Sequence, residues 1–274
     1  LMIFGAITNS WRHQLQTTDL KDLATKAEAC GARHIELRQT CLGDYETGEG
    51  DEWRPVVTRL RALADASSDL SFNLAMAWPC LTRRSEPRGD AFQAALEGAK
   101  AVGRSEPHLR LVDPAPFDAR WESPDDVPDQ ALAVSELAAE AARQGIVLSI
   151  ENSWLPIDNI AMLVDMARDR MDPDESGYLG LCPDPINQLR GHPDTDPLED
   201  LADIPPDVNK IVHFKQSRGG QPYRSVDTGD LDCDRMVDIL QDQGFDGPAI
   251  MEIPSDPNVF DNLKASFAFL SRRV

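Results

Sequence analysis

The sequence predicts an α/β fold, a (β/α)8 or TIM barrel that forms one domain over residues 1–274. Eight short apolar segments recur at intervals of roughly 30–38 residues, the length of one strand followed by one helix. Several of the intervening segments have the periodicity and the end residues of amphipathic helices. No linker or low-complexity stretch divides the chain. Eight strand–helix units in a chain of this length form a barrel more often than a doubly wound sheet.

The predicted strands are short apolar runs, as expected for parallel strands that are covered on both faces. They are Ile3–Thr8, Arg33–Arg38, Leu70–Met76, His108–Asp113, Ile146–Glu151, Tyr178–Asp184, Lys210–Lys215 and Pro248–Ile253. Side chains alternate between the two faces of a strand, so His34, Glu36 and Arg38 should point into the barrel. His213 and Lys215 should do the same in the seventh strand.

Predicted helices are recognised by capping residues at the start and glycine at the end. They are Leu20–Cys30 after Thr17-Thr18 and before Gly31, Gln130–Arg143 before Gly145, Asp232–Gln243 before Gly244, and a last helix that opens at Asp256-Pro257. The segment Pro197–Ile204, after the sixth strand, is short and bounded by proline.

The composition limits the partners that we expect. The net charge is -20 and the pI about 4.5, so the surface should repel nucleic acids and anionic membranes. No apolar run approaches the roughly 20 residues that span a bilayer, and no signal peptide opens the sequence, so we expect a soluble cytoplasmic protein. The acidity suits a high-salt cytoplasm, although a GC-rich genome gives similar usage. Five scattered cysteines without a CxxC pair argue against disulfides and against a zinc-thiolate site.

The last four predicted strands each place a metal-ligating residue at the same end of the barrel. These residues are Glu151, Asp184, His213 and Glu252. Three converging carboxylates repel one another without a counter-charge, and with one imidazole they suit Mn²⁺, Mg²⁺ or Co²⁺. The alternative is a network of ion pairs in which Lys215, Arg38 and Arg218 neutralise the carboxylates.

Three tryptophans, Trp11, Trp78 and Trp154, follow the ends of strands one, three and five. Tryptophans at one rim fit a pocket with aromatic walls, as sugar-binding sites often have. The alternative is that two of the three only pack against the core.

Several motifs appear in a fixed order along nearly the whole chain. They are Ile35-Glu36-Leu37, Ser149-Ile150-Glu151-Asn152, Asp184-x-x-Asn187, His213-Phe214-Lys215, Gly229-Asp230-Leu231-Asp232 and Phe245-Asp246-Gly247-x-x-x-x-Glu252. With them the sequence resembles the xylose isomerase-like superfamily of sugar and sugar phosphate isomerases and epimerases, nearest to its tagatose/psicose 3-epimerase branch. The motifs are specific to the superfamily in combination, and none is specific to a substrate.

The resemblance implies that one divalent metal ion, first of all Mn²⁺, is bound by the Glu/Asp/His/Glu set, with Glu151 and Glu252 as the acid/base pair. It implies isomerase or epimerase activity on a sugar or keto-polyol through an enediolate, and a homo-oligomeric state such as a dimer or tetramer. Substrate contacts are expected from the three tryptophans and from Glu36, Asn187, Lys215 and Arg218. Lys215 could instead form a rim salt bridge, and Arg218 could be a solvated loop residue.

Two departures from the branch lie in the expected substrate shell. Asn187 stands where the branch usually has histidine, and Arg218 is spaced differently from the corresponding arginine. The loop 39–53 is unusually acidic and would disfavour a strongly anionic substrate if it covered the site.

Other functions remain open on the same scaffold. A dehydratase of an inosose- or dehydroshikimate-like substrate needs the same metal and the same proton abstraction. A non-catalytic accessory barrel would not need the intact ligand set. A DNA-repair endonuclease needs a histidine-rich multi-metal site and a basic face, which five histidines and the acidic charge exclude.

Overall fold

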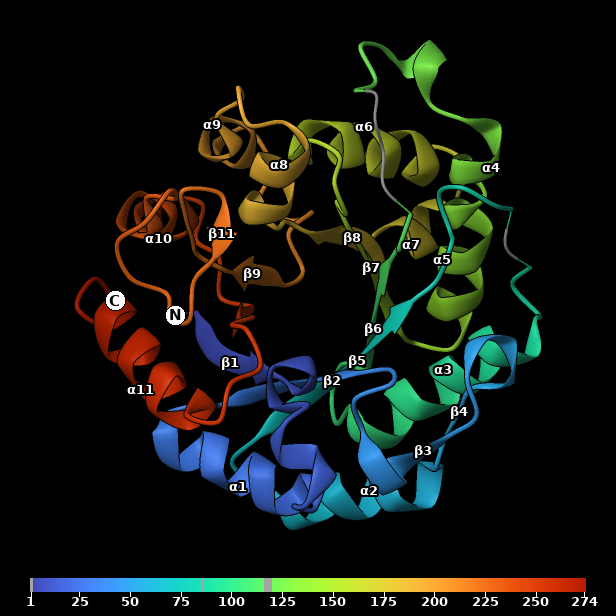
Figure 1. Ribbon diagram of the computed structural model, residues 1–274. Helices are drawn as coiled ribbons and strands as arrows, with labels where there is room; N and C mark the ends of the chain where they lie inside the picture. Colours follow the sequence, from blue (N-terminus) through green and yellow to red (C-terminus); the bar gives the residue numbers. More distant parts are fainter. Residues whose placement is uncertain (1, 85, 116–119) are drawn as a thin grey trace.

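Eight parallel strands form a barrel inside a ring of helices (Figure 1). The computed structural model describes residues 2–84, 86–115 and 120–274. The barrel strands are β1 (Ile3–Ile7), β2 (His34–Arg38), β5 (Ser71–Ala77), β6 (His108–Val112), β7 (Val147–Glu151), β8 (Leu179–Cys182), β9 (Val212–Phe214) and β12 (Pro248–Met251). Each lies within a segment predicted from the sequence, or extends one residue beyond it, so the predicted barrel fold is confirmed.

The sheet runs in the order β8-β7-β6-β5-β2-β1-β12-β9, and its two end strands meet to close the ring. The contact between them is short. A parallel bridge joins Leu181 to Asn209, and the amide of His213 donates to the carbonyl of Pro183 over 3.0 Å. The barrel is therefore nearly closed, with its weakest backbone pairing between β8 and β9.

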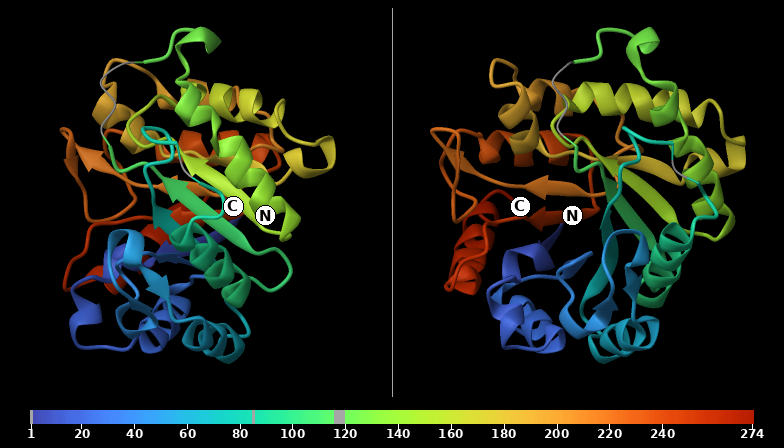
Figure 2. Two further views of the ribbon diagram at one scale, coloured as in Figure 1. Left: turned by 90° about the vertical axis from the view of Figure 1, so that its right-hand side faces the viewer. Right: turned by 45° about the vertical axis from the view of Figure 1, so that its right-hand side comes forward.

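Helices cover the outside of the barrel, as the turned views in Figure 2 show. The longer ones are α1 (Leu20–Cys30), α2 (Val57–Ala66), α3 (Asp90–Val102), α5 (Val134–Arg143), α6 (Ile157–Arg168), α10 (Cys233–Asp242) and α11 (Val259–Leu270). The short ones are α4 (Asp129–Leu132), α7 (Pro173–Ser176), α8 (Pro185–Gly191) and α9 (Pro197–Ala202). Two small hairpins pair β3 (Glu46–Thr47) with β4 (Arg54–Pro55) and β10 (Ser217–Arg218) with β11 (Gln221–Pro222). No helix within the described ranges is long and apolar enough to cross a membrane.

The capping signals explain where several helices begin and end. Asp19 accepts a hydrogen bond from Lys21 at the start of α1, and Gly31 ends that helix with a φ of 119°. The predicted helix Gln130–Arg143 is interrupted at Ala133, which separates α4 from α5. Helix α8 was not predicted, because its first residues directly follow a strand.

The barrel interior is unusual because only one side of it is apolar. Ile7, Cys182, Ile211 and Ile250 form a small buried cluster on the side of β1, β8, β9 and β12. The other side is filled by buried polar residues, namely His34, Glu36, Asn73, His108, Arg110 and Ser149. Barrel interiors are usually filled by branched aliphatic side chains. The polar side must therefore be held by hydrogen bonds and ion pairs rather than by packing.

His108, at the floor of this polar side, should make folding stability depend on pH. Burial lowers the pKa of its imidazole to about 3, so it stays neutral while its Nε2 contacts the hydroxyl of Ser149 at 2.7 Å. Below the ordinary pKa of about 6.5 the unfolded chain binds a proton that the folded chain does not. This contribution is complete above pH 6.5 and is lost as the pH falls towards 3. His108→Gln should therefore remove about 2 kcal/mol of the stability difference between pH 7 and pH 5, measured by urea unfolding. An unchanged difference would contradict the assignment.

Candidate metal centre at the carboxyl ends of the strands

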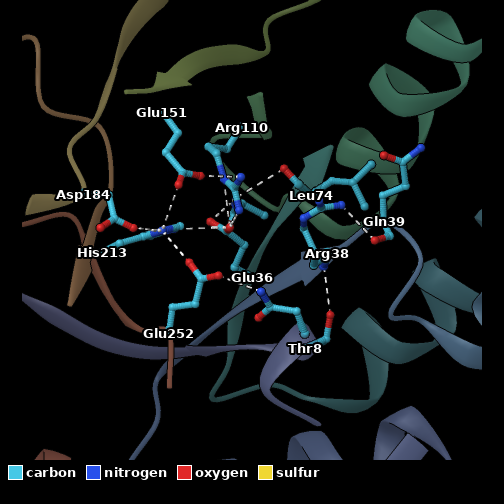
Figure 3. A network of polar contacts seen from close by, with 12 residues as sticks. Thr8, Glu36, Arg38, Gln39, Leu74, Arg110, Glu151, Asp184, His213 and Glu252 are labelled. Carbon is cyan, nitrogen blue, oxygen red and sulfur yellow. Dashed lines mark hydrogen bonds and ion pairs between the residues drawn. The ribbon is translucent and has the colours of Figure 1, made fainter. Parts of the chain in front are cut away.

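Four acidic and imidazole side chains meet at the end of the barrel where the strands finish (Figure 3). They are Glu151, Asp184, His213 and Glu252, and one potential ligand atom from each lies within 4.8 Å of the others. His213 and Asp184 are fully buried, whereas the Glu252 side chain retains 18% of its exposure. The structure thus brings together the four residues that the strand ends predicted.

Local structure fixes where each of the four side chains stands. Glu151 is the last residue of β7, and His213 is the central residue of β9. Asp184 follows β8 and caps α8, because its Oδ1 accepts the amide of Asn187 over 2.9 Å. Glu252 follows β12, and its amide donates to the carbonyl of Phe214 over 3.0 Å. All four therefore depend on the closure of the sheet rather than on long loops.

His213 lies at the centre of the acidic cluster. Its Nδ1 is 2.9 Å from Glu252 Oε2 and 3.5 Å from Asp184 Oδ2, and its Nε2 is 3.4 Å from Glu36 Oε1. Despite these distances, neither ring nitrogen has a hydrogen-bond partner of normal geometry in the described part of the chain. A buried polar atom without a partner costs free energy of folding. A cation bound by an imidazole nitrogen would remove this cost.

The two glutamates are held on both of their carboxylate oxygens. Arg110 Nη1 lies 2.7 Å from Glu151 Oε2, and Asn187 Nδ2 donates to Glu151 Oε1 over 2.7 Å. Asn9 Nδ2 donates to Glu252 Oε1 over 2.7 Å. These contacts fix the carboxylate planes, so the remaining lone pairs point to a defined position.

Arg110 is the functional residue that the sequence did not reveal. It lies in β6, is almost completely buried, and links Glu36 to Glu151, with its Nε 3.0 Å from Glu36 Oε1 and its Nη2 also on that oxygen. Burial alone would raise the pKa of Glu36, but the nearby Arg110 charge outweighs it and holds that pKa well below its usual range. The alternation of β6, which sends His108 and Arg110 inward, was the available signal.

Lys215 supplies the second cation of the cluster. Its Nζ is 2.7 Å from Asp184 Oδ2 and 3.0 Å from Glu252 Oε2. Burial would lower the pKa of Lys215, but these two carboxylates raise it above its ordinary value, so it remains an ammonium. It also donates to Asn187 Oδ1 over 3.3 Å, which connects it indirectly to Glu151.

The charges of the buried cluster favour a divalent cation. Glu36, Glu151, Asp184 and Glu252 carry four negative charges, and Arg110 and Lys215 carry two positive ones. Burial would lower the pKa of His213, but the nearby Cys182 and the carboxylates raise it well above its ordinary value. With the neutral imidazole that metal binding requires, the cluster has a net charge of -2. Three carboxylates and one imidazole are hard or borderline ligands that suit Mn²⁺, Mg²⁺ or Co²⁺. The charge and the unpartnered buried atoms both fit one such ion bound by these four residues.

The other residues predicted for substrate binding lie in different environments. Glu36 is fully buried beneath the cluster, and Trp11 is fully buried with its ring 5.7 Å from that of Phe260. Trp78 is almost buried, whereas Trp154 is 38% exposed. Arg218 lies on the hairpin β10–β11, where it pairs with Asp227 at 2.8 Å and stacks on the ring of Tyr223. Asn187 and Lys215 thus contact the acidic cluster directly, and Arg218 is engaged elsewhere.

Comparison with known proteins establishes the family. A sequence model of the xylose isomerase-like TIM barrel matches residues 72–273. The chain belongs to this family. The predicted superfamily is therefore confirmed, and the site lies where the strands of a xylose isomerase-like barrel end. A search of curated proteins finds no significant match.

Solved structures with the same fold include enzymes of different reaction classes. One is the D-allulose 3-epimerase from Methylomonas sp. in complex with D-allulose, with 15% identity, a TM-score of 0.67, and coverage of 100% of this chain and 97% of that chain. Another is the probable 3-DHS dehydratase AsbF from Bacillus anthracis, with 15% identity, a TM-score of 0.73 and full coverage of both chains. A third is the IOLI protein with a binding zinc atom, with 15% identity, a TM-score of 0.65, and coverage of 99% and 96%. At these identities the likeness concerns the fold.

Proposed function

We propose that the protein is a divalent-metal-dependent isomerase or epimerase that acts on a sugar or keto-polyol. The convergence of Glu151, Asp184, His213 and Glu252 within 4.8 Å carries this proposal. Solved structures with this fold include an epimerase and a probable dehydratase, which supports an enzyme of this general type. We propose Mn²⁺ as the metal, because the ligand set is rich in oxygen and contains one imidazole.

The proposed mechanism depends on two glutamates on opposite sides of one substrate position. The bound metal would supply Lewis-acid polarisation of the substrate carbonyl. Glu151 or Glu252 removes the proton on the carbon next to that carbonyl, and the other glutamate returns a proton from the opposite face. Return to the same carbon gives epimerisation, and return to the neighbouring carbon gives isomerisation. Asn187 and Asn9 orient the two carboxylates, each through a 2.7 Å hydrogen bond.

A dehydratase is the second candidate, and Lys215 is the observation that favours it. A dehydration begins with the same proton abstraction but also needs a group that stabilises the departing hydroxyl. Lys215 is an ammonium between two carboxylates, and its side chain is 15% exposed at the mouth of the site. It is therefore placed to donate a hydrogen bond to a departing hydroxyl group and to stabilise the negative charge that develops there.

Exchange of substrate hydrogen with deuterium would test the proposal and separate the two reactions. The Mn²⁺-loaded protein should incorporate deuterium from D₂O next to the carbonyl of a ketohexose such as D-allulose or of a keto-polyol acid, without loss of water. Mass spectrometry and NMR would measure the label. Loss of water from a keto-polyol substrate, with no epimer formed, would favour the dehydratase. Failure to bind one equivalent of Mn²⁺, measured by metal analysis after loading, would contradict both enzymes and favour an accessory barrel.

A further inference from the structure

Arg38 is a cation near the metal centre that forms no ion pair with a carboxylate in the described part of the chain. It is the last residue of β2 and shares the inward face with Glu36 (Figure 3). Its side chain makes one hydrogen bond, from Nη1 to the backbone carbonyl of Gln39 over 2.9 Å. No ion pair joins it to any carboxylate within residues 2–84, 86–115 and 120–274. In a chain with 47 acidic and 27 basic residues, such an arginine is unexpected.

Three of the five carboxylates of the nearby acidic loop 39–53 have partners other than Arg38. Glu46 accepts hydrogen bonds from the amides of Thr40 and Leu42 and from the indole of Trp53. Asp44 pairs with Arg59 at 3.4 Å, and Asp51 pairs with Arg83 at 3.8 Å. The other two, Glu49 and Glu52, form no ion pair with Arg38 within the described residues.

The sum of the charges at the site indicates that Arg38 lacks a negative counter-charge once a metal ion is bound. A divalent ion would bring the cluster of four carboxylates, Arg110 and Lys215 from -2 to zero. Arg38 then adds one uncompensated positive charge at the mouth of the same site. Burial of this guanidinium, together with repulsion from Arg110, lowers its pKa, and the charges of Glu252 and Glu151 offset this only in part. One negative charge on a bound molecule would offset the remainder.

We infer that Arg38 binds a carboxylate of the substrate, so the enzyme acts on a keto-polyol that carries one acid group rather than on a neutral sugar. This rests on the proposed function for the position of the substrate. A planar guanidinium with its remaining N–H groups free can form two parallel hydrogen bonds to a carboxylate. Arg38 would thus determine specificity and the orientation of the substrate, while the glutamates perform the proton transfer.

Binding of shikimate and of its neutral isostere shikimamide would test this inference without relying on turnover. Both are unreactive polyols that differ in one charge. In calorimetry with the Mn²⁺-loaded protein, shikimate should bind at least about tenfold more tightly than shikimamide. Arg38→Met should abolish the difference, and Arg38→Lys should restore part of it. Arg218→Met is the matched control, since Arg218 is already paired with Asp227, and it should keep the preference. Circular dichroism would confirm that each variant is folded.

The outcomes separate this inference from the proposed function. A wild-type protein that binds shikimate no more tightly than shikimamide overturns the role of Arg38, as does a preference that survives in Arg38→Met. In either case, Mn²⁺ binding and deuterium exchange into a neutral ketohexose would leave the proposed function standing. Conversely, an Arg38-dependent preference in a protein that binds no Mn²⁺ would support the carboxylate site and contradict the metal-dependent reaction.

Discussion

Replacement of Arg110 by methionine should lower the free energy of unfolding by about 3–5 kcal/mol, because it leaves two buried carboxylates without their counter-charge. Glu36 is fully buried and Glu151 nearly so, and the guanidinium lies between them. Methionine fills similar volume, so the loss is mainly electrostatic. Urea unfolding, followed by circular dichroism, would measure it.

The control for this prediction combines two substitutions. Arg110→Met with Glu36→Gln removes one buried charge of each sign, so it should be less destabilising than Arg110→Met alone. Saturating Mn²⁺ should recover part of the loss, since a cation near Glu151 compensates its charge. Arg143→Met removes an exposed ion pair and should leave the unfolding midpoint almost unchanged. If Arg110→Met were as stable as the exposed variant, the buried network would not hold the barrel interior.

Replacement of Glu151 by glutamine should reduce turnover by about 10²–10⁴-fold while the chain remains folded. The amide keeps the shape of the side chain but cannot accept a proton. The same substitution at Glu252 should have an effect of similar size if both residues transfer protons. Deuterium exchange and product formation under identical Mn²⁺ loading would measure the loss, and calorimetry would report the change in Mn²⁺ affinity separately.

Glu97→Gln provides the matched control for both glutamates, because Glu97 is exposed on α3, in the helical layer outside the barrel. It should have wild-type activity. Turnover by Glu151→Gln within a few-fold of this control would exclude Glu151 as an acid or base. A loss of Mn²⁺ binding together with activity would instead assign Glu151 mainly to holding the metal.

The barrel and the meeting of the four ligands could be predicted because a parallel sheet places all its carboxyl ends on one rim. Once Glu151 and Glu252 are assigned to strand ends, the barrel topology alone predicts that they lie close together, and no individual contact has to be known. Arg110 could not be assigned a partner in this way. Its ion pairs depend on the strand register, which places it level with Ala75 and Ser149, and on a side chain that reaches across the interior.

Other differences between prediction and structure arise where one sequence pattern is compatible with two local structures. Asp184-Pro185 carries a capping residue and an N1 proline, but the same residues also read as the end of a strand, so α8 was missed. A tryptophan after a strand fits a pocket wall or the core equally well. Trp11 lies against α11 and Trp154 reaches the surface, and this difference depends on neighbours that are distant in sequence.

At the weak junction between β8 and β9, a bound metal ion would have a second role. Asp184 lies just beyond β8, one end strand of the sheet, and His213 lies within β9, the other. A cation bound by both residues would therefore connect the two end strands. Metal coordination would then link β8 and β9 where they share few backbone hydrogen bonds. Separation of these two strands would move Asp184 and His213 apart, and removal of the metal would in turn weaken the contact between the strands.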